Sequence, residues 1–174
     1  RMLAERDHPV ADVFWGNEEF QIRRLAAKGL LRSTNGWAAF GQRARRLVAG
    51  SDQRTLVTLG LEQLTNAIYR GRVSLAAPWF GSTAAHFAAL RAEWGQDKWL
   101  AWCRGLAANQ VFLEEGNSQV VRRVGLGEAS VGLTDSDDIR AAQHGGMTVV
   151  AGPDLWPVRN VVGVLARAPH PEAA

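Results

Sequence analysis

Three acidic residues in one short segment have the types and spacing for metal chemistry. Asp135, Asp137 and Asp138 lie within four positions, after an apolar run at 129–133 that predicts a β-strand. Carboxylate oxygens are the ligands that hard cations prefer, so the cluster could hold a metal ion. The same side chains could instead stabilise the first turn of a following helix through its dipole. The spacing leaves both interpretations open.

Two other segments could bind an anion. One consists of Gly81, Ser82 and Thr83, the other of Asn117 and Ser118, and each follows a predicted strand. Glycine allows a ligand close to the backbone, and a helix N-terminus supplies free N–H groups. Capping of the helices that follow is the alternative role for these polar side chains.

Aromatic and acidic residues flank these segments. Trp15 and Trp79 lie beside predicted loops and could line a ligand cavity, whereas Glu18 and Glu19 could be first-turn acids of a helix. The four histidines show no metal-ligand spacing, so we interpret each as a surface or capping residue: His8, His86, His144 and His170. Cys103 is the only cysteine, which excludes an internal disulfide framework and an all-cysteine zinc site.

Composition and charge exclude several classes of protein. The chain has 174 residues, 47% of them hydrophobic, and a net charge of +3. We expect arginine pairs such as Arg45-Arg46 to be solvated, and so small a positive excess does not predict nucleic-acid binding. No apolar run approaches the roughly 20 residues of a membrane span. The sequence also lacks a G-x-S-x-G elbow, a G-x-G-x-x-G loop and a Walker A loop.

Alternating strands and helices predict an α/β fold with a mainly parallel sheet. In such a sheet, ligands bind at the carboxyl ends of the strands, where the three polar segments lie. We predict strands at 11–15, 37–48, 72–78, 111–113, 129–133, 148–151 and 161–166, and helices at 18–28, 60–67, 82–94, 96–107, 119–125 and from about 138 to 144.

Several stretches resemble the periplasmic solute-binding proteins of ABC importers, in the extracellular solute-binding protein family 1, and most closely their ferric-iron-binding branch. They run in order along the chain: 11–18 (ADVFWGNE), 26–31 (AAKGLL), 69–73 (YRGRV), 116–121 (GNSQVV), 127–135 (GEASVGLTD) and 168–174 (APHPEAA). The resemblance implies a type-2 periplasmic-binding-protein-like fold, with two α/β lobes that close on a ligand.

Within that fold, we expect residues 1–49 to form part of the first lobe and a crossing strand. Residues 50–155 would form a nearly complete second lobe, and residues 156–174 a strand returning toward the first. The chain opens at Arg1 and ends where 170–172 predict the start of a helix, so we expect a fragment of a longer chain that lacks its signal segment.

The resemblance also implies a ligand site. Ferric-binding members hold iron with an adjacent tyrosine pair, and Asp137 and Asp138 align with that pair. Tyr69 is the only tyrosine and falls in a structural segment, so carboxylates rather than phenolates would bind a metal here. The acidic ligand from the first lobe corresponds to Asn17 or Glu18, and the anion-holding loop and asparagine correspond to 81–83 and 117.

We therefore expect a non-enzymatic, periplasmic or extracellular protein that delivers a ligand to a membrane permease, without inserting into the membrane or binding nucleic acid. Ferric iron or another metal, held with a synergistic anion, is the first expected cargo. An organic cation, or a phosphorylated or carboxylated solute, is the alternative for the same fold. A further alternative is a metal-dependent α/β hydrolase that uses residues 135–138.

Overall fold

The structure is a computed structural model that describes residues 2–33, 36–51, 59–170 and 172. These residues form two compact units. Unit 1 contains residues 1–42 and 158–174, and unit 2 contains residues 43–157. Two long strands, β2 (Trp37–Gly50) and β6 (Val149–Val164), contribute residues to both units. Among the described residues, no helix combines the length and apolar character needed to cross a bilayer.

In unit 1, a short strand and one helix pack on the end of β6. Strand β1 (Val13–Gly16) pairs antiparallel with β6, and Val13 lies opposite Val164. Helix α1 (Glu19–Ala27) buries Ile22 and Leu25, three positions apart and therefore on one face, in a cluster with Val161. Unit 1 thus has a small apolar core of its own.

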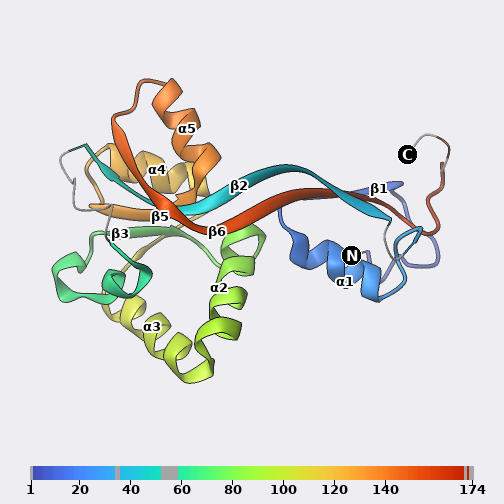
Figure 1. Cartoon of the computed structure of the whole chain (residues 1–174), viewed down its shortest axis with the longest axis horizontal. Helices are drawn as coiled ribbons and strands as arrows, with labels where there is room; N and C mark the ends of the chain where they lie inside the picture. The colour runs from blue at the N-terminus through green and yellow to red at the C-terminus, as the bar shows by residue number, and fades with distance from the viewer. Residues whose placement is uncertain (1, 34–35, 52–58, 171, 173–174) are drawn as a thin grey trace. The chain divides into compact units, whose positions relative to one another are not determined.

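Unit 2 has helices on both faces of its strands (Figure 1). Strand β3 (Val73–Ala76) runs parallel to β4 (Phe112–Glu114) and to β5 (Val131–Asp135), whereas β5 is antiparallel to β2. Figure 1 shows α2 (Gly81–Trp94) and α3 (Gln96–Ala108) on one face, and α4 (Asn117–Gly125) and α5 (Ser136–His144) on the other. Two 3₁₀ helices precede β3, η2 (Leu61–Thr65) and η3 (Ala67–Tyr69).

The hydrogen-bonded strand order is β1-β6-β2-β5-β3-β4. The sheet is mixed, because it contains both antiparallel and parallel pairs. Two expectations about its elements were wrong. The separate strands expected at 148–151 and 161–166 are one continuous strand, β6. Proline is uncommon inside a strand, but Pro153 and Pro157 lie within this one. The loop expected at 134–138 is absent, since β5 continues to Asp135 and α5 begins at the next residue. The helix start predicted at 170–172 includes Pro171, which lies outside the described residues.

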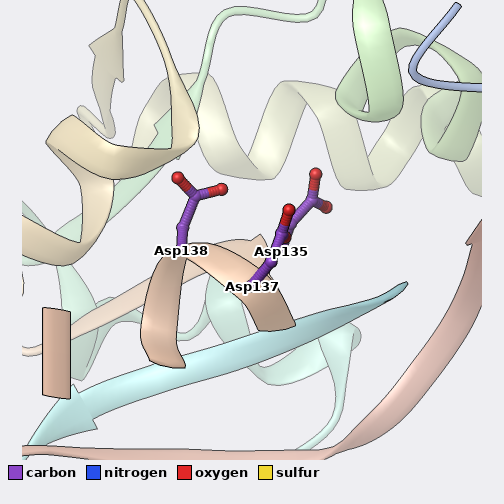
Figure 2. Close-up of side chains that lie close together, drawn as sticks. All are labelled: Asp135, Asp137 and Asp138. Carbon is purple, nitrogen blue, oxygen red and sulfur yellow. The ribbon is translucent and has the colours of Figure 1, made fainter. Parts of the chain in front are cut away.

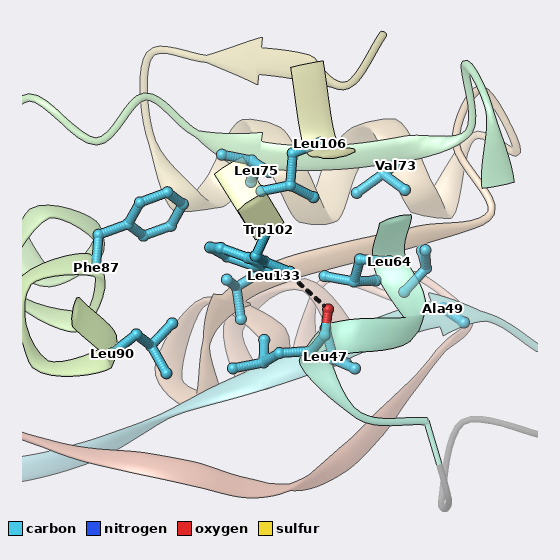
Figure 3. Close-up of a cluster of buried hydrophobic side chains, with 12 residues drawn as sticks. Leu47, Ala49, Leu64, Val73, Leu75, Phe87, Leu90, Trp102, Leu106 and Leu133 are labelled. Atoms are coloured by element: carbon cyan, nitrogen blue, oxygen red, sulfur yellow. Dashed lines mark hydrogen bonds between the residues drawn. The ribbon is translucent and has the colours of Figure 1, made fainter. Parts of the chain in front are cut away.

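The main core of unit 2 lies between the sheet and the α2/α3 layer (Figure 3). Trp102 is buried there, and its ring contacts that of Phe87 with centroids 5.1 Å apart. The Trp102 indole N–H donates a 2.8 Å hydrogen bond to the Leu61 carbonyl, so this side chain ties α3 to η2. The bond satisfies a polar group that would otherwise be buried without a partner.

We predict that Trp102→Phe lowers the free energy of unfolding by about 1–3 kcal/mol, because it leaves the Leu61 carbonyl unsatisfied and shrinks a buried ring. Urea denaturation of the full-length protein measures this change. Trp79→Phe is the matched control, since Trp79 is 75% exposed and its substitution should have almost no effect. Equal losses in the two variants would contradict the structural role of the Trp102 bond.

Candidate functional site

Three helices of unit 2 begin at the carboxyl ends of parallel strands. Helix α2 follows β3, α4 follows β4 and α5 follows β5. Their N-cap residues are Phe80, Gly116 and Asp135, and none of the three side chains makes a capping hydrogen bond. We call the start of these three helices the polar edge; it includes Ser82, Asn117, Asp135, Asp137 and Asp138. Asp135, the one polar N-cap, forms hydrogen bonds with other side chains of the polar edge instead of capping α5.

Asp135 is the centre of the polar edge. Its Oδ2 accepts hydrogen bonds from Ser82 Oγ at 2.6 Å, Asn117 Nδ2 at 3.0 Å and Arg43 Nε at 2.9 Å. Its Oδ1 pairs with an Arg45 guanidinium nitrogen at 2.7 Å. Burial raises the pKa of Asp135, but the Arg45 charge and the hydrogen bonds outweigh burial, so the pKa lies below its usual value. Both carboxylate oxygens of Asp135 are thus already occupied.

Arg43 and Arg45 pair with Asp135 at the polar edge, and neither was predicted there from the sequence. Arg45 was expected at the surface, and this was wrong: the residue is 0% exposed. Its guanidinium also bonds to Asn117 Oδ1 at 3.0 Å, which joins β2 to α4. The available signal was the alternation of a strand, because residues 43, 45 and 47 share a face and Leu47 is a core residue.

Asp137 and Asp138 are the two acids of the cluster that this network leaves accessible. Oxygens of Asp135, Asp137 and Asp138 lie within 4.8 Å of one another, and Figure 2 shows all three side chains on the same side of the start of α5. The Asp137 side chain is 58% exposed, and its Oδ1 lies 3.6 Å from Arg43 Nε. Burial and the negative charges of its two neighbours raise the pKa of Asp138 to about 6. A cation bound here would relieve that repulsion.

The other predicted site residues of unit 2 lie in or just before the first turns of α2 and α4. Ser82, Thr83 and Asn117 lie at the polar edge with Gly81 and Ser118, as the topology of the strands implied. Trp79 precedes α2 and is largely exposed. Their contacts with a ligand stay predictions.

Three predicted site residues lie in unit 1. Trp15 is exposed and packs on Phe40, with ring centroids 4.5 Å apart. Glu18 is buried and caps α1, where its carboxylate accepts the backbone N–H groups of Phe20 and Gln21. Asn17 lies between the end of β1 and this cap. Glu18 was expected in the first turn of a helix and is instead the N-cap of α1, whereas Glu19 is the first-turn acid. The role of Glu18 as a metal ligand stays a prediction.

His86 was expected at the surface or at a helix cap, and this was wrong. The residue is buried on α2, where its ring stacks on Trp156 with centroids 5.5 Å apart and an interplanar angle of 14°. Burial and the Arg45 charge lower the pKa of His86 to about 3, so the imidazole is neutral at physiological pH. The residues around His86 in the sequence do not distinguish a buried histidine from an exposed one.

The raised pKa of Asp138 predicts a pH-dependent stability. The folded protein binds the Asp138 proton more tightly than the unfolded chain, so the contribution of this group to stability falls as the pH rises from about 4 to about 6. Asp138→Asn should therefore raise the melting temperature of ligand-free protein at pH 7, with a gain that shrinks toward pH 4. Asp97→Asn, which also removes a first-turn acid, is the control. A gain for Asp138→Asn that is independent of pH would contradict this assignment.

The chain matches a known protein family over almost its whole length. The profile of the bacterial extracellular solute-binding proteins matches residues 2–174. The chain belongs to this family. No curated protein sequence matches the chain.

Solved structures of similar fold include solute-binding proteins with different ligands. Iron-bound HitA from Pseudomonas aeruginosa has a TM-score of 0.85 and 22% identity, and the match covers 98% of this chain and 64% of the HitA chain. AfuA from Actinobacillus pleuropneumoniae, with fructose-6-phosphate bound, has a TM-score of 0.82 and 18% identity, covering 99% and 63%. The apo ferric ion-binding protein A of Pasteurella haemolytica has a TM-score of 0.78 and 16% identity, covering 95% and 62%.

At these identities the structural likeness shows the fold alone, and it confirms the expected periplasmic-binding-protein-like α/β architecture. The chain spans less than two thirds of the length of these three relatives. Membership in a solute-binding family favours ligand binding over the hydrolase alternative for residues 135–138.

Proposed function

We propose that this solute-binding protein captures a cation at the polar edge of unit 2 and delivers it to the membrane permease of an ABC importer, in the periplasm or outside the cell. In this proposal the two units correspond to two lobes, and residues of unit 1 complete the site when the lobes close. Asn17, Glu18 and Trp15 are the expected contributions of unit 1. Lobe closure would make affinity depend on groups from both sides.

The observation that carries the proposal is the pair of accessible carboxylates, Asp137 and Asp138. They offer hard oxygen ligands, whereas Asp135 is already neutralised by two arginines. Burial, and then the negative charges of Asp137 and Asp135, raise the pKa of Asp138, so the ionised form of this carboxyl group is costly without a bound cation. A bound cation would favour the ionised form of both side chains.

Ferric iron is the first candidate cargo, followed by another metal ion. The resemblance aligns Asp137 and Asp138 with the tyrosine pair that binds iron in ferric-binding relatives, and a carboxylate is also a hard oxygen donor. Two carboxylates do not fill the coordination sphere of a metal ion, so a synergistic anion and residues of unit 1 would supply the remaining ligands. An organic cation would use the same pair as counter-charges rather than as ligands.

A phosphorylated or carboxylated solute is the second candidate function, and a specific observation favours it. The first turns of α2, α4 and α5 carry N–H groups at the polar edge without side-chain caps. Uncapped helix N-termini are suitable anion sites. Asp137 and Asp138 in the first turn of α5 oppose this alternative, since they would repel an anion unless a cation bound with it.

A thermal-shift panel on the full-length protein tests the proposal. The panel contains ferric ion with and without carbonate, divalent metal ions, spermidine, and hexose phosphates. A ligand that binds only the folded state raises the melting temperature by mass action. We expect the largest rise with ferric ion and carbonate. A rise with hexose phosphate alone would replace the cation proposal with the anion alternative.

A further inference from the structure

Unit 2 contains a cavity of about 370 Å³ that the polar edge does not explain. It lies between η2, one side of α2 and the β6 segment at 155–156. None of Ser82, Asn117, Asp135, Asp137 or Asp138 is among the described residues that line it. Its volume is within the range of small-molecule sites in proteins.

The charged groups of the cavity wall are acidic. Glu62 and Glu93 line the cavity, and the described lining residues include no lysine or arginine. Trp94, Trp156 and Leu90 provide a wide apolar surface between these acids. A wall of this composition favours a ligand that carries a positive charge on an apolar body.

An ammonium group of the protein itself already uses this wall. Lys98 Nζ lies 2.5 Å from Glu62 Oε1 and 5.0 Å from the centroid of the Trp94 ring. The rim thus combines a carboxylate and an aromatic face in the geometry that binds ammonium ions. Glu93 is exposed and remains available to a second cation.

His86 closes the inner wall of the cavity. The residue is 1% exposed, and its imidazole is neutral at physiological pH. The ring is held flat against Trp156, so both side chains form one aromatic wall.

We propose that this cavity is a second ligand site, which binds a small organic ammonium compound with a flat apolar body. The ammonium group contacts Glu93 and takes the place of Lys98 on the face of Trp94, and the apolar body fills the space beside Trp156 and Leu90. The site is independent of the proposed cargo at the polar edge.

Calorimetric titration of the full-length protein with 2-phenylethylammonium tests this proposal. We expect saturable binding of one molecule per chain, and binding of the neutral 2-phenylethanol that is weaker by about 2- to 5-fold, the value of one exposed cation–π contact. Glu93→Gln should weaken the ammonium probe by a similar factor. Lys98→Met should strengthen it, because Glu62 then gains a free carboxylate.

Two substitutions on α2 separate this cavity from other sites. Ala89 lines the cavity and Ala92 is not among the described lining residues, so Ala89→Trp should abolish binding and Ala92→Trp should retain it. Asp137→Asn and Asp138→Asn should leave it unchanged. The proposal is overturned by absence of saturable binding, by equal affinity for the neutral probe, by no effect of Glu93→Gln and Lys98→Met, or by loss in the Asp137 and Asp138 variants.

Discussion

Replacing Asp135 with alanine is expected to lower the free energy of unfolding by about 3–5 kcal/mol, because it leaves a buried arginine charge without its partner. Arg45 is fully buried, and its closest ion-pair contact is the 2.7 Å contact with Asp135. Ser82 and Asn117 would each lose an acceptor in the same substitution. Urea denaturation of the full-length protein without ligand measures the change.

Asp154→Ala is the matched control for this prediction. Asp154 also pairs with an arginine of β2, Arg46, but this pair is largely exposed to solvent. Exposed ion pairs contribute about 1 kcal/mol at most, so the control should lose little stability. A loss below about 1 kcal/mol in Asp135→Ala would mean that the network around Arg45 does not hold the strands and helices of the polar edge together.

The second large effect concerns cargo binding. The double variant Asp137→Asn/Asp138→Asn is expected to lose at least about 100-fold in affinity for ferric ion, the upper limit for outer-shell substitutions, because two direct ligands lose their charge. Asparagine has nearly the same size as aspartate, so the helix start should keep its shape. Competition with nitrilotriacetate on the full-length protein measures the affinity.

Asp97→Asn is the control for the double variant, since Asp97 lies in the first turn of another helix of unit 2. It should bind ferric ion as the unmodified protein does. If the double variant binds ferric ion with unchanged affinity, the carboxylate pair is not the metal site. If the Asp97 variant loses affinity equally, a general charge effect rather than coordination explains the loss.

The order of elements could be predicted from the sequence because hydrophobic periodicity is local information. The strand and helix patterns around β3, β5 and α2 place Ser82, Asn117 and Asp135 at one sheet edge, and the structure brings them into hydrogen-bond contact. The same reasoning placed Asp137 and Asp138 beside them. Parallel strand topology was sufficient for this part of the site.

The arginines of the site could not be predicted in the same way. Burial of Arg45 depends on Asp135, which is 90 positions away in the sequence, and a charged residue is exposed more often than not. His86 was misplaced for a related reason, because the Trp156 ring that covers it belongs to β6. Strand alternation could place Arg45 on the buried face of β2, but no local pattern identifies the distant partner of Arg45 or of His86.

The proposed function requires that a cation binds at Asp137 and Asp138. Calorimetric titration of the full-length protein with ferric nitrilotriacetate and carbonate at pH 7 and pH 5, corrected for protonation of the chelator, tests this binding. We expect one ferric ion per chain at pH 7 and weaker binding at pH 5, where Asp138, with its pKa of about 6, takes up a proton. Absence of saturable binding at pH 7, or an affinity that does not change between the two pH values, would contradict the proposed function.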